Sequence, residues 1–204
     1  MLYAIDTKTQ QKISPEPGLM AVCSYCESSV IAKCGSINRW HWAHKSLNDC
    51  DIWGEGETDW HLEWKSQFDK NQVEVNIEKC NSLHRADVIL NDGTILELQH
   101  SFITPETILE RESFYGSMIW VFDLSDCITE KENRFHVEEK ENAYGKYYSF
   151  NWLYPKKHVF YVKQRKAFDL GNGKIFIVKE HYKPKYGWGD VWEKQQFIDW
   201  LKGL

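Results

Sequence analysis

Two acidic side chains stand in neighbouring apolar segments of residues 83–101. Asp87 comes directly before an apolar triplet, and Glu97 and Gln99 are two positions apart in the next segment. Alternate residues of a strand share a face, so Glu97 and Gln99 are expected to point the same way. Buried carboxylates are costly unless they are paired or bind a metal. Asp87 and Glu97 are therefore candidate metal ligands; the alternative is an edge hairpin with one solvated face.

The elements that would position these acids can be read on either side of them. The Asn-Asp-Gly sequence at 91–93 predicts a tight turn, and so a hairpin over 83–101. A strand is expected before it at 73–77. A helix is expected after it, from an N-cap at Thr104 to Tyr115, with its end at Gly116. The nearly all-apolar segment 118–124 predicts a strand covered on both faces.

A further helix is expected over residues 55–70. Aromatic residues recur every four positions on one face, and Glu57, His61 and Lys65 recur on a neighbouring face. This second row is either a solvated ladder of ion pairs or, if the helix packs beside the hairpin, a source of a carboxylate, an imidazole and an ammonium near the two acids.

Thiols and imidazoles gather near the N-terminus. Cys23 and Cys26 form a Cys-x-x-Cys turn, and His41, His44 and Cys50 follow within the same short segment. Four of these five are expected to bind a structural zinc ion, which would supply folding energy that so small a core lacks. A redox Cys-x-x-Cys and a set of unrelated buried residues are the alternatives.

The three remaining cysteines, Cys34, Cys80 and Cys127, are interpreted as small buried hydrophobes. The N-terminal residues lack the layout of a secretory signal, and no run of about 18 apolar residues exists. We therefore expect a cytoplasmic protein that does not associate with membranes and has thiols or metal ligands rather than disulfides.

Charge is unevenly distributed along the chain. The net charge is −5, yet residues 156–185 contain nine Lys or Arg against two acids. A basic segment in an otherwise acidic chain suits a protein that contacts phosphates with one region and holds a divalent metal with another. A lysine-rich solvated surface is the alternative.

The outer parts of the chain give weaker signals. A strand and a turn are expected within residues 2–14, and strands are expected at 159–162 and 174–178, with a turn at 171–173 between them. An amphipathic helix is expected over 190–202. Residues 125–155 give no structural or functional assignment.

The order helix, three strands, helix, strand, with Asp at the second strand and Glu-x-Gln at the third, resembles the PD-(D/E)XK nuclease superfamily. More closely, residues 20–125 resemble the competence protein CoiA-like nucleases, in which a Cys/His segment precedes the nuclease domain. The matching motifs are Cys23-x-x-Cys26, the His41 to His44 box, the Glu57, His61 and Lys65 row, Arg85 to Val88, Glu97 to Ser101, and Arg111 to Tyr115.

This resemblance implies an α/β fold with a PD-(D/E)XK restriction-endonuclease-like αβββαβ core. It also implies a small zinc-finger-like N-terminal subdomain and a C-terminal β-hairpin plus helix. We accordingly expect a zinc-finger-like subdomain over 1–52, a nuclease core over 53–126 and a C-terminal extension of that core over 127–204.

The resemblance also implies roles for single residues. Asp87 and Glu97 would ligate Mg²⁺ or Mn²⁺, and Glu57 would complete the metal shell. Gln99 occupies the place usually held by a lysine, so that Lys65 or His61 would have to supply positive charge. Three further residues are candidates for binding the substrate phosphate: Arg85, Ser101 and Arg111.

The expected function is Mg²⁺-dependent hydrolysis of DNA, single- or double-stranded, by a protein that could form a homodimer. Two other classes remain open. One is a catalytically inactive DNA-binding module of the same fold, in which tryptophans stack on bases. The other is a zinc-supported protein-interaction domain without nucleic acid.

Overall fold

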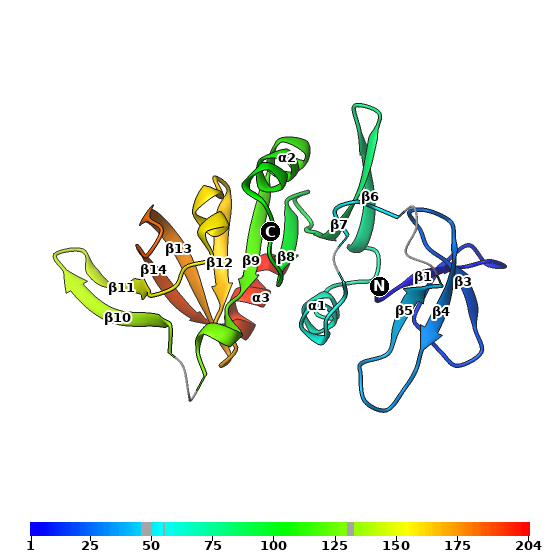
Figure 1. Ribbon diagram of the computed structural model, residues 1–204, viewed down its shortest axis with the longest axis horizontal. Coiled ribbons are helices and arrows are strands. Elements are labelled where there is room, and N and C mark those ends of the chain that lie inside the picture. Colours follow the sequence, from blue (N-terminus) through cyan, green and yellow to red (C-terminus); the bar gives the residue numbers. More distant parts are fainter. Residues whose placement is uncertain (46–49, 55, 130–132) are drawn as a thin grey trace. The chain divides into compact units, whose positions relative to one another are not determined.

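The computed structural model describes residues 1–45, 50–54, 56–129 and 133–204. The chain forms two compact units, Met1–Leu90 and Asn91–Leu204 (Figure 1). Both helices and strands are present, as expected for a mixed α/β protein. The boundary between the units falls inside the expected nuclease core, and the three-part division of the chain stays a prediction.

The first unit begins with a small antiparallel sheet in the order β2-β1-β3-β4-β5. Its strands are β1 (Ala4–Asp6), β2 (Lys12–Ile13), β3 (Met20–Val22), β4 (Ser29–Lys33) and β5 (His41–His44). Trp42 and a few small side chains fill its core, together with Cys23. The expected strand and turn within residues 2–14 are present as β1 and β2. So small a core fits the expectation that a metal supports this segment.

A short helix, α1 (Asp59–Lys65), follows in the first unit. It is shorter than the expected helix over 55–70, because Thr58 caps its N-terminus and Ser66 its C-terminus. Glu57 therefore precedes the helix, and Glu55 lies outside the described residues. Of the two interpretations left open for the row of Glu57, His61 and Lys65, the solvated ladder is wrong, since His61 and Lys65 are both buried.

The first unit ends with an antiparallel hairpin of β6 (Val73–Lys79) and β7 (Ser82–Ile89). Its turn is formed by Cys80 and Asn81, both with positive φ, at 52° and 60°. Cys80 is exposed there, so the interpretation of Cys80 as a buried hydrophobe is wrong. Cys127 is buried as expected, whereas Cys34 is half-buried.

The second unit contains a sheet in the order β10-β11-β14-β13-β12-β9-β8. Strand β9 (Met118–Asp123) is parallel to β8 (Ile95–Gln99) on one side and to β12 (Arg165–Asp169) on the other. Helix α2 (Pro105–Tyr115) connects β8 to β9, and its N-cap is Thr104, as expected. The expected turn at 91–93 precedes β8, with Gly93 at φ 83°.

The remaining elements of this unit are η1 (Ser125–Cys127), β10 (Phe135–Asn142), β11 (Gly145–Trp152), η2 (Lys157–Tyr161), β13 (Lys174–Lys183), β14 (Tyr186–Glu193) and α3 (Lys194–Lys202). The expected strand at 159–162 is wrong, because that segment is mostly the 3₁₀ turn η2. The strand expected at 174–178 is confirmed as part of β13. The last helix begins at Lys194 rather than at Asp190, since residues 186–193 pair with β13.

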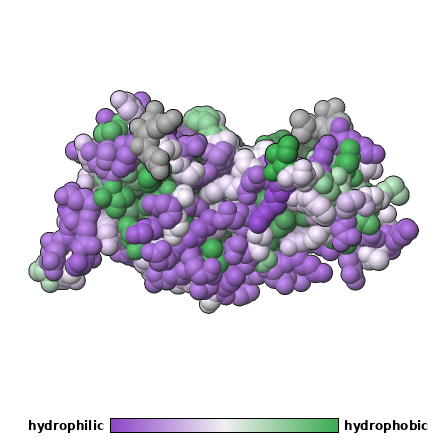
Figure 2. Space-filling model, turned by 90° about the horizontal axis from the view of Figure 1, so that it is seen from below, coloured by the Kyte–Doolittle hydropathy of each residue, from purple (hydrophilic) through white to green (hydrophobic). Residues whose placement is uncertain are grey.

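Aromatic side chains fill the core of the second unit. Phe135 and Phe150 stack at 5.0 Å, and Trp152 and Phe168 pack edge to face at 5.7 Å. Trp120 and Trp152 are therefore core residues, whereas Trp188 is exposed. The face in Figure 2 is mostly hydrophilic, with scattered hydrophobic side chains. Among the described residues, no helix is long and apolar enough to cross a membrane.

The expected order of helix, three strands, helix, strand is present as α1, β6, β7, β8, α2 and β9. The two strands of the expected 83–101 hairpin fall in different units, β7 in the first and β8 in the second. Their pairing stays a prediction. Within the units, β7 pairs with β6, and β8 pairs with β9.

Candidate functional site

Helix α1 begins with a capping box that orients its buried face. The side chain of Thr58 accepts a hydrogen bond from the backbone N–H of His61, and the His61 ring Nδ1 accepts one from the backbone N–H of Thr58. Two backbone N–H groups that have no partner within the helix are thus satisfied at its start. One turn further on, Lys65 lies on the same face and is buried. The capping box therefore fixes the helix that carries the lysine.

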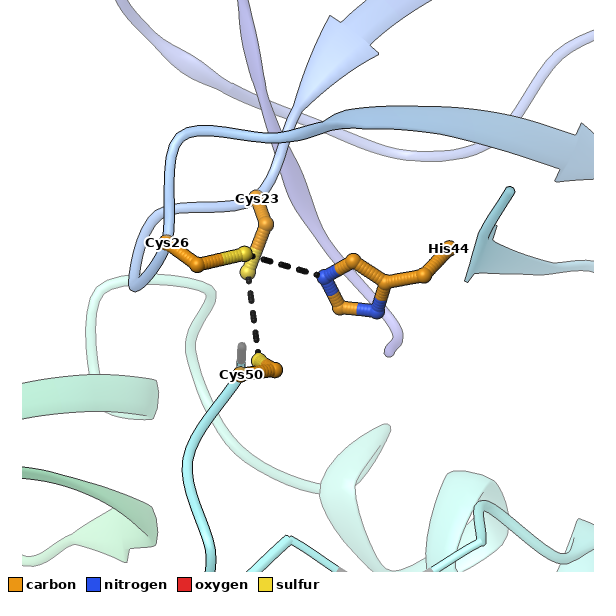
Figure 3. Close-up of side chains that lie close together, drawn as sticks. All are labelled: Cys23, Cys26, His44 and Cys50. Carbon is orange, nitrogen blue, oxygen red and sulfur yellow. Dashed lines mark hydrogen bonds between the residues drawn. The ribbon is translucent and has the colours of Figure 1, made fainter. Parts of the chain in front are cut away.

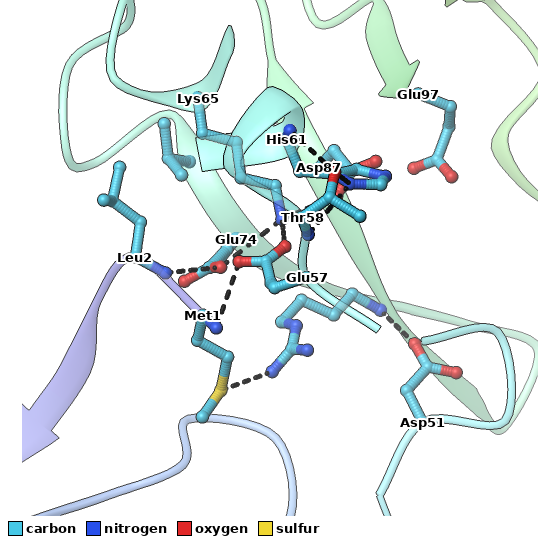
Figure 4. Close-up of polar contacts among 12 residues, drawn as sticks. Met1, Leu2, Asp51, Glu57, Thr58, His61, Lys65, Glu74, Asp87 and Glu97 are labelled. Carbon is cyan, nitrogen blue, oxygen red and sulfur yellow. Dashed lines mark hydrogen bonds and ion pairs between the residues drawn. The ribbon is translucent and has the colours of Figure 1, made fainter. Parts of the chain in front are cut away.

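The ammonium of Lys65 is surrounded by carboxylates. Its Nζ lies 2.6 Å from Glu57 Oε1, 2.9 Å from Asp87 Oδ1 and 3.4 Å from Glu74 Oε1 (Figure 4). Only 4% of the lysine side chain is exposed. Burial by itself would lower the pKa of Lys65, but the three carboxylates raise it well above its ordinary value. The lysine is therefore a permanent cation in an acidic cluster.

The carboxylate of Glu57 bridges two cations. Besides Lys65, it contacts the ammonium of Met1, at 3.0 Å from Oε2. Burial would raise the pKa of Glu57, but these two cations hold it below its ordinary range. Glu57 is thus ionised, as a metal ligand must be.

Glu74 was not among the expected site residues. It is buried in β6, where its carboxylate accepts hydrogen bonds from the backbone N–H groups of Leu2 and Tyr3 at 2.9 and 3.1 Å. Its φ is 52°, which is uncommon for a residue other than glycine. The sequence shows only an acid between two valines of a predicted strand, which does not reveal this environment.

In the second unit, Glu97 on β8 is paired with Arg111 on α2. Their Oε2 and Nη1 atoms are 2.8 Å apart, and both side chains are almost completely buried. The Arg111 guanidinium also lies over the Trp120 ring, 5.8 Å from its centroid. Gln99 is buried on the same strand and donates a hydrogen bond from Nε2 to the carbonyl of Ser101 at 3.2 Å. Arg111 is thus bound to a candidate metal ligand, and a role of Arg111 towards phosphate stays a prediction.

A His–Asp pair follows the Glu-x-Gln motif and was also not expected. His100 Nδ1 lies 2.7 Å from Asp123 Oδ2. Lys156 Nζ donates to the backbone carbonyls of both residues, at 3.3 and 3.2 Å. Burial would raise the pKa of Asp123, but hydrogen bonds from Ser125 and the contact with His100 lower it. Lys156, from the basic segment, thus has a structural role here.

Four of the five expected zinc ligands come together in the first unit. The side chains of Cys23, Cys26, His44 and Cys50 each place one ligand atom within 4.8 Å of all the others (Figure 3). The Cys26 Sγ and His44 Nε2 atoms are 3.3 Å apart, and the Cys23 and Cys50 sulfurs are 4.0 Å apart. With Zn–S bonds of about 2.3 Å, the edges of a tetrahedral site are about 3.8 Å. The donor set and its spacing fit zinc.

His41 is the expected candidate that lies outside this cluster. Its Nδ1 atom is 2.9 Å from the backbone carbonyl of Arg39. His41 and His44 occupy opposite ends of β5, so the His-x-x-His spacing does not distinguish them. Burial raises the pKa of the Cys50 thiol to about 11. Burial would also raise the pKa of Cys26, but hydrogen bonds involving Ser28, Cys23 and Cys50 together lower it. Deprotonation of both thiols by a metal ion would make binding depend on pH.

Arg85 lies beside this cluster on β7. Its Nη1 atom is 3.4 Å from Cys23 Sγ and 3.1 Å from Met1 Sδ. The backbone N–H of Arg85 donates to Asp51 Oδ2 at 2.7 Å. The structure thus places Arg85 against the sulfur cluster, and its expected contact with phosphate stays a prediction.

The fold and these contacts define a mixed α/β protein with a Cys₃His cluster that could hold a metal, followed by a segment with buried charged residues. A family model of the competence protein CoiA N-terminal domain matches residues 20–53, and one of the competence protein CoiA nuclease-like domain matches residues 57–183. The chain therefore belongs to the competence protein CoiA family. No curated protein and no solved structure matches it significantly. The matched segments extend beyond residue 125, where the resemblance noted in the sequence ends.

Proposed function

We propose that this chain is a metal-dependent nuclease that hydrolyses phosphodiester bonds of DNA, with a PD-(D/E)XK-type core. The observation that carries the proposal is the contact between the buried Lys65 ammonium and the Asp87 carboxylate, within the segment that matches a nuclease-like domain. Buried charges of this kind are more frequent at functional sites than elsewhere. Lys65 supplies the positive charge that Gln99, at the usual lysine position, lacks.

The acidic residues have the chemistry that Mg²⁺ or Mn²⁺ requires, because carboxylate oxygens are the hard ligands these ions prefer. Asp87, Glu57 and Glu97 are the residues that would hold such an ion. When bound, the ion would neutralise phosphate charge and lower the pKa of a water molecule. The Lys65 ammonium, whose pKa is raised by its contacts with Asp87, Glu57 and Glu74, would contribute positive charge beside the ion.

Arg85, Ser101 and Arg111 are the residues proposed to bind the substrate phosphate, and His61 is the other candidate for supplying positive charge at the catalytic site. The first three contact protein groups in the structure, and His61 is bound to Thr58 at the helix start. The proposed partner is DNA, either single- or double-stranded. A homodimer and a cytoplasmic location are also part of the proposal.

One observation favours a second candidate, a DNA-binding module without catalysis. Asp87 is paired with Lys65, and Glu97 is paired with Arg111. A metal ion would have to compete with a cation at each acid. In an inactive module these ion pairs would be permanent, and the exposed lysines of the basic segment would still bind phosphates.

The deciding experiment incubates the purified chain with linear, circular and single-stranded DNA, with and without Mg²⁺ or Mn²⁺. We expect metal-dependent products that Asp87→Asn and Glu97→Gln each reduce at least about 100-fold. Glu78→Gln is the matched control, because Glu78 is an exposed acid on the same hairpin. Circular dichroism verifies that each variant is folded.

Undiminished cleavage by Asp87→Asn and Glu97→Gln would refute this site. If no metal-dependent product forms and a variant with both Asp87→Asn and Glu97→Gln still binds DNA, the inactive module is established instead. Absence of salt-dependent DNA binding would leave only a protein-interaction domain.

A further inference from the structure

The two segments that carry cysteine ligands of the candidate metal site, residues 23–26 and 50–53, both contact the hairpin β6–β7. In the Cys-x-x-Cys segment, the Ser24 carbonyl accepts a hydrogen bond from Asn76 Nδ2 at 2.6 Å, and Tyr25 Oη donates one to the Leu83 carbonyl at 2.9 Å. These contacts join the loop between two metal ligands to both strands of the hairpin. The position of the hairpin therefore depends on the conformation of this loop.

The segment after Cys50 contacts strand β7 at His84 and Arg85, directly after Leu83. Asp51, adjacent to Cys50, is buried. Its Oδ2 atom accepts a hydrogen bond from the backbone N–H of Arg85 at 2.7 Å, and its Oδ1 atom lies 3.0 Å from His84 Nδ1. The Trp53 ring stacks on the His84 ring, with centroids 3.3 Å apart. A carboxylate that binds both a backbone N–H and a side chain fixes the strand at this point.

The side chain of Arg85 completes the connection by donating from Nη1 to Cys23 Sγ at 3.4 Å. Three thiolates and a neutral imidazole around Zn²⁺ would carry a net charge of about −1. A guanidinium with an N–H directed at one sulfur stabilises that charge, as groups next to metal ligands commonly do. The guanidinium is fully ionised at all relevant pH values. Arg85 thus has the charge and the geometry of a partner for the loaded metal site.

Asp87 stands two residues after Arg85 on β7, so both side chains lie on the same face of the strand. We propose that Arg85 is a positioning residue, which joins the Cys23, Cys26, His44 and Cys50 metal site to strand β7 and so holds Asp87 against Lys65. Metal binding then orders the candidate catalytic acid from a distance. This coupling is a property of the first unit and does not depend on whether the chain cleaves DNA.

The test uses the full chain loaded with zinc and measures two properties. The first is the rate at which a chelator removes zinc, in wild type, Arg85→Gln and Arg85→Lys. The second is amide hydrogen exchange in β7, in zinc-loaded and zinc-free wild type and in zinc-loaded Arg85→Gln. Arg39→Gln is the matched control, since Arg39 is an exposed arginine of the same unit that contacts Ser66.

We expect Arg85→Gln to release zinc about 10-fold faster than wild type, and Arg85→Lys to lie between them because it retains the charge. Zinc removal from wild type should speed exchange in β7 at least about 10-fold and leave β13 unchanged. Zinc-loaded Arg85→Gln should show fast exchange in β7 as well. A residue that only supports folding would change global stability without this metal-dependent, strand-specific effect.

Two outcomes would overturn the proposal. One is a zinc release rate for Arg85→Gln equal to that of wild type. The other is exchange in β7 that does not change on zinc removal from wild type. The second measurement needs no variant, so it can refute the coupling between the metal site and β7 even if both Arg85 variants fail to fold.

Discussion

The Nζ atom of Lys65 lies 2.9 Å from Asp87 Oδ1, and a single buried ammonium therefore connects helix α1 to strand β7. The same ammonium contacts Glu57 and Glu74, so it is the common partner of three acids. Its removal would leave carboxylates close together in a site with little solvent. The stability of the first unit should therefore depend strongly on this lysine.

Lys65→Met is expected to lower the free energy of unfolding by about 3–5 kcal/mol, the usual cost of removing one partner from a buried ion pair. Urea denaturation measures this difference. Lys70→Met is the control, because Lys70 is exposed shortly after the same helix and should change stability by less than about 0.5 kcal/mol. Equal unfolding midpoints for Lys65→Met and wild type would show that the ammonium is not the partner the acids require.

Zinc content should separate the two histidines of β5. His44→Ala and Cys26→Ser are expected to lose bound zinc and to lower the melting temperature, whereas His41→Ala should retain about one zinc per chain. Elemental analysis of the purified proteins and thermal denaturation provide the two measurements. Cys80→Ser, which changes an exposed thiol outside the cluster, serves as the control. Loss of zinc from His41→Ala but not from His44→Ala would contradict the assigned ligand set.

Stability should increase with pH in the alkaline range because of Lys166. This lysine is buried and donates to the carbonyls of Val159 and Val162, and burial lowers its pKa to about 8, against a smaller opposing effect of Glu112. Between that value and about 10.5, the unfolded chain binds more protons than the folded one, so a rise in pH favours folding. The gain is at most about 3 kcal/mol.

Urea unfolding at pH 7.5 and pH 10 gives the change in the free energy of unfolding between the two pH values. The contribution of Lys166 is this change in wild type minus the same change in Lys166→Met. The comparison with the variant removes the effect of tyrosines and thiols that titrate in the same range. A pH dependence that is identical in the two proteins would mean that Lys166 keeps an ordinary pKa in the folded state.

DNA binding, if it occurs, should depend on the exposed lysines of the basic segment. Lys183 and Lys185 are both exposed near the turn between β13 and β14. The double change to glutamate should weaken binding. On duplex DNA it should also reduce the slope of log K against log salt by about 0.9 for each phosphate that the protein no longer neutralises. Fluorescence anisotropy over a range of salt concentrations measures the slope.

The double variant Lys8→Glu and Lys33→Glu changes charge by the same amount at exposed positions of the first unit and is the control for net charge. An equal loss of binding in both double variants would show that total charge, rather than the basic segment, determines the affinity.

Local chemistry accounts for the parts of the structure that the sequence predicts well. The Cys-x-x-Cys turn, the Thr104 cap and the turn at residues 91–93 each depend on a few adjacent residues, and the structure contains all three. The convergence of Glu57 and Asp87 on Lys65 followed from one of two open interpretations, because spacing along a chain does not determine what a helix packs against. Glu74 could not be inferred, since its partners are remote in sequence.

Tertiary pairing accounts for the errors in the second unit. Residues 138–141 of β10 are all charged and exposed, so this strand, which pairs with β11, shows no alternation of apolar and polar residues there. Residues 190–193 were expected to be helical but pair with β13. Gly189 permits this pairing, because a Cβ there would lie 1.9 Å from the Ile177 carbonyl oxygen. Such a close approach of two backbones cannot be recognised from the glycine alone.

The turn between β6 and β7 has a practical consequence. Cys80 is the exposed cysteine of the six, and it stands at the tip of a hairpin whose base carries Asp87. A maleimide spin label should therefore react there preferentially while zinc protects the cluster thiols. With a second spin label on the sheet that contains β13, the distance between the two labels would report on the orientation of the two units in solution.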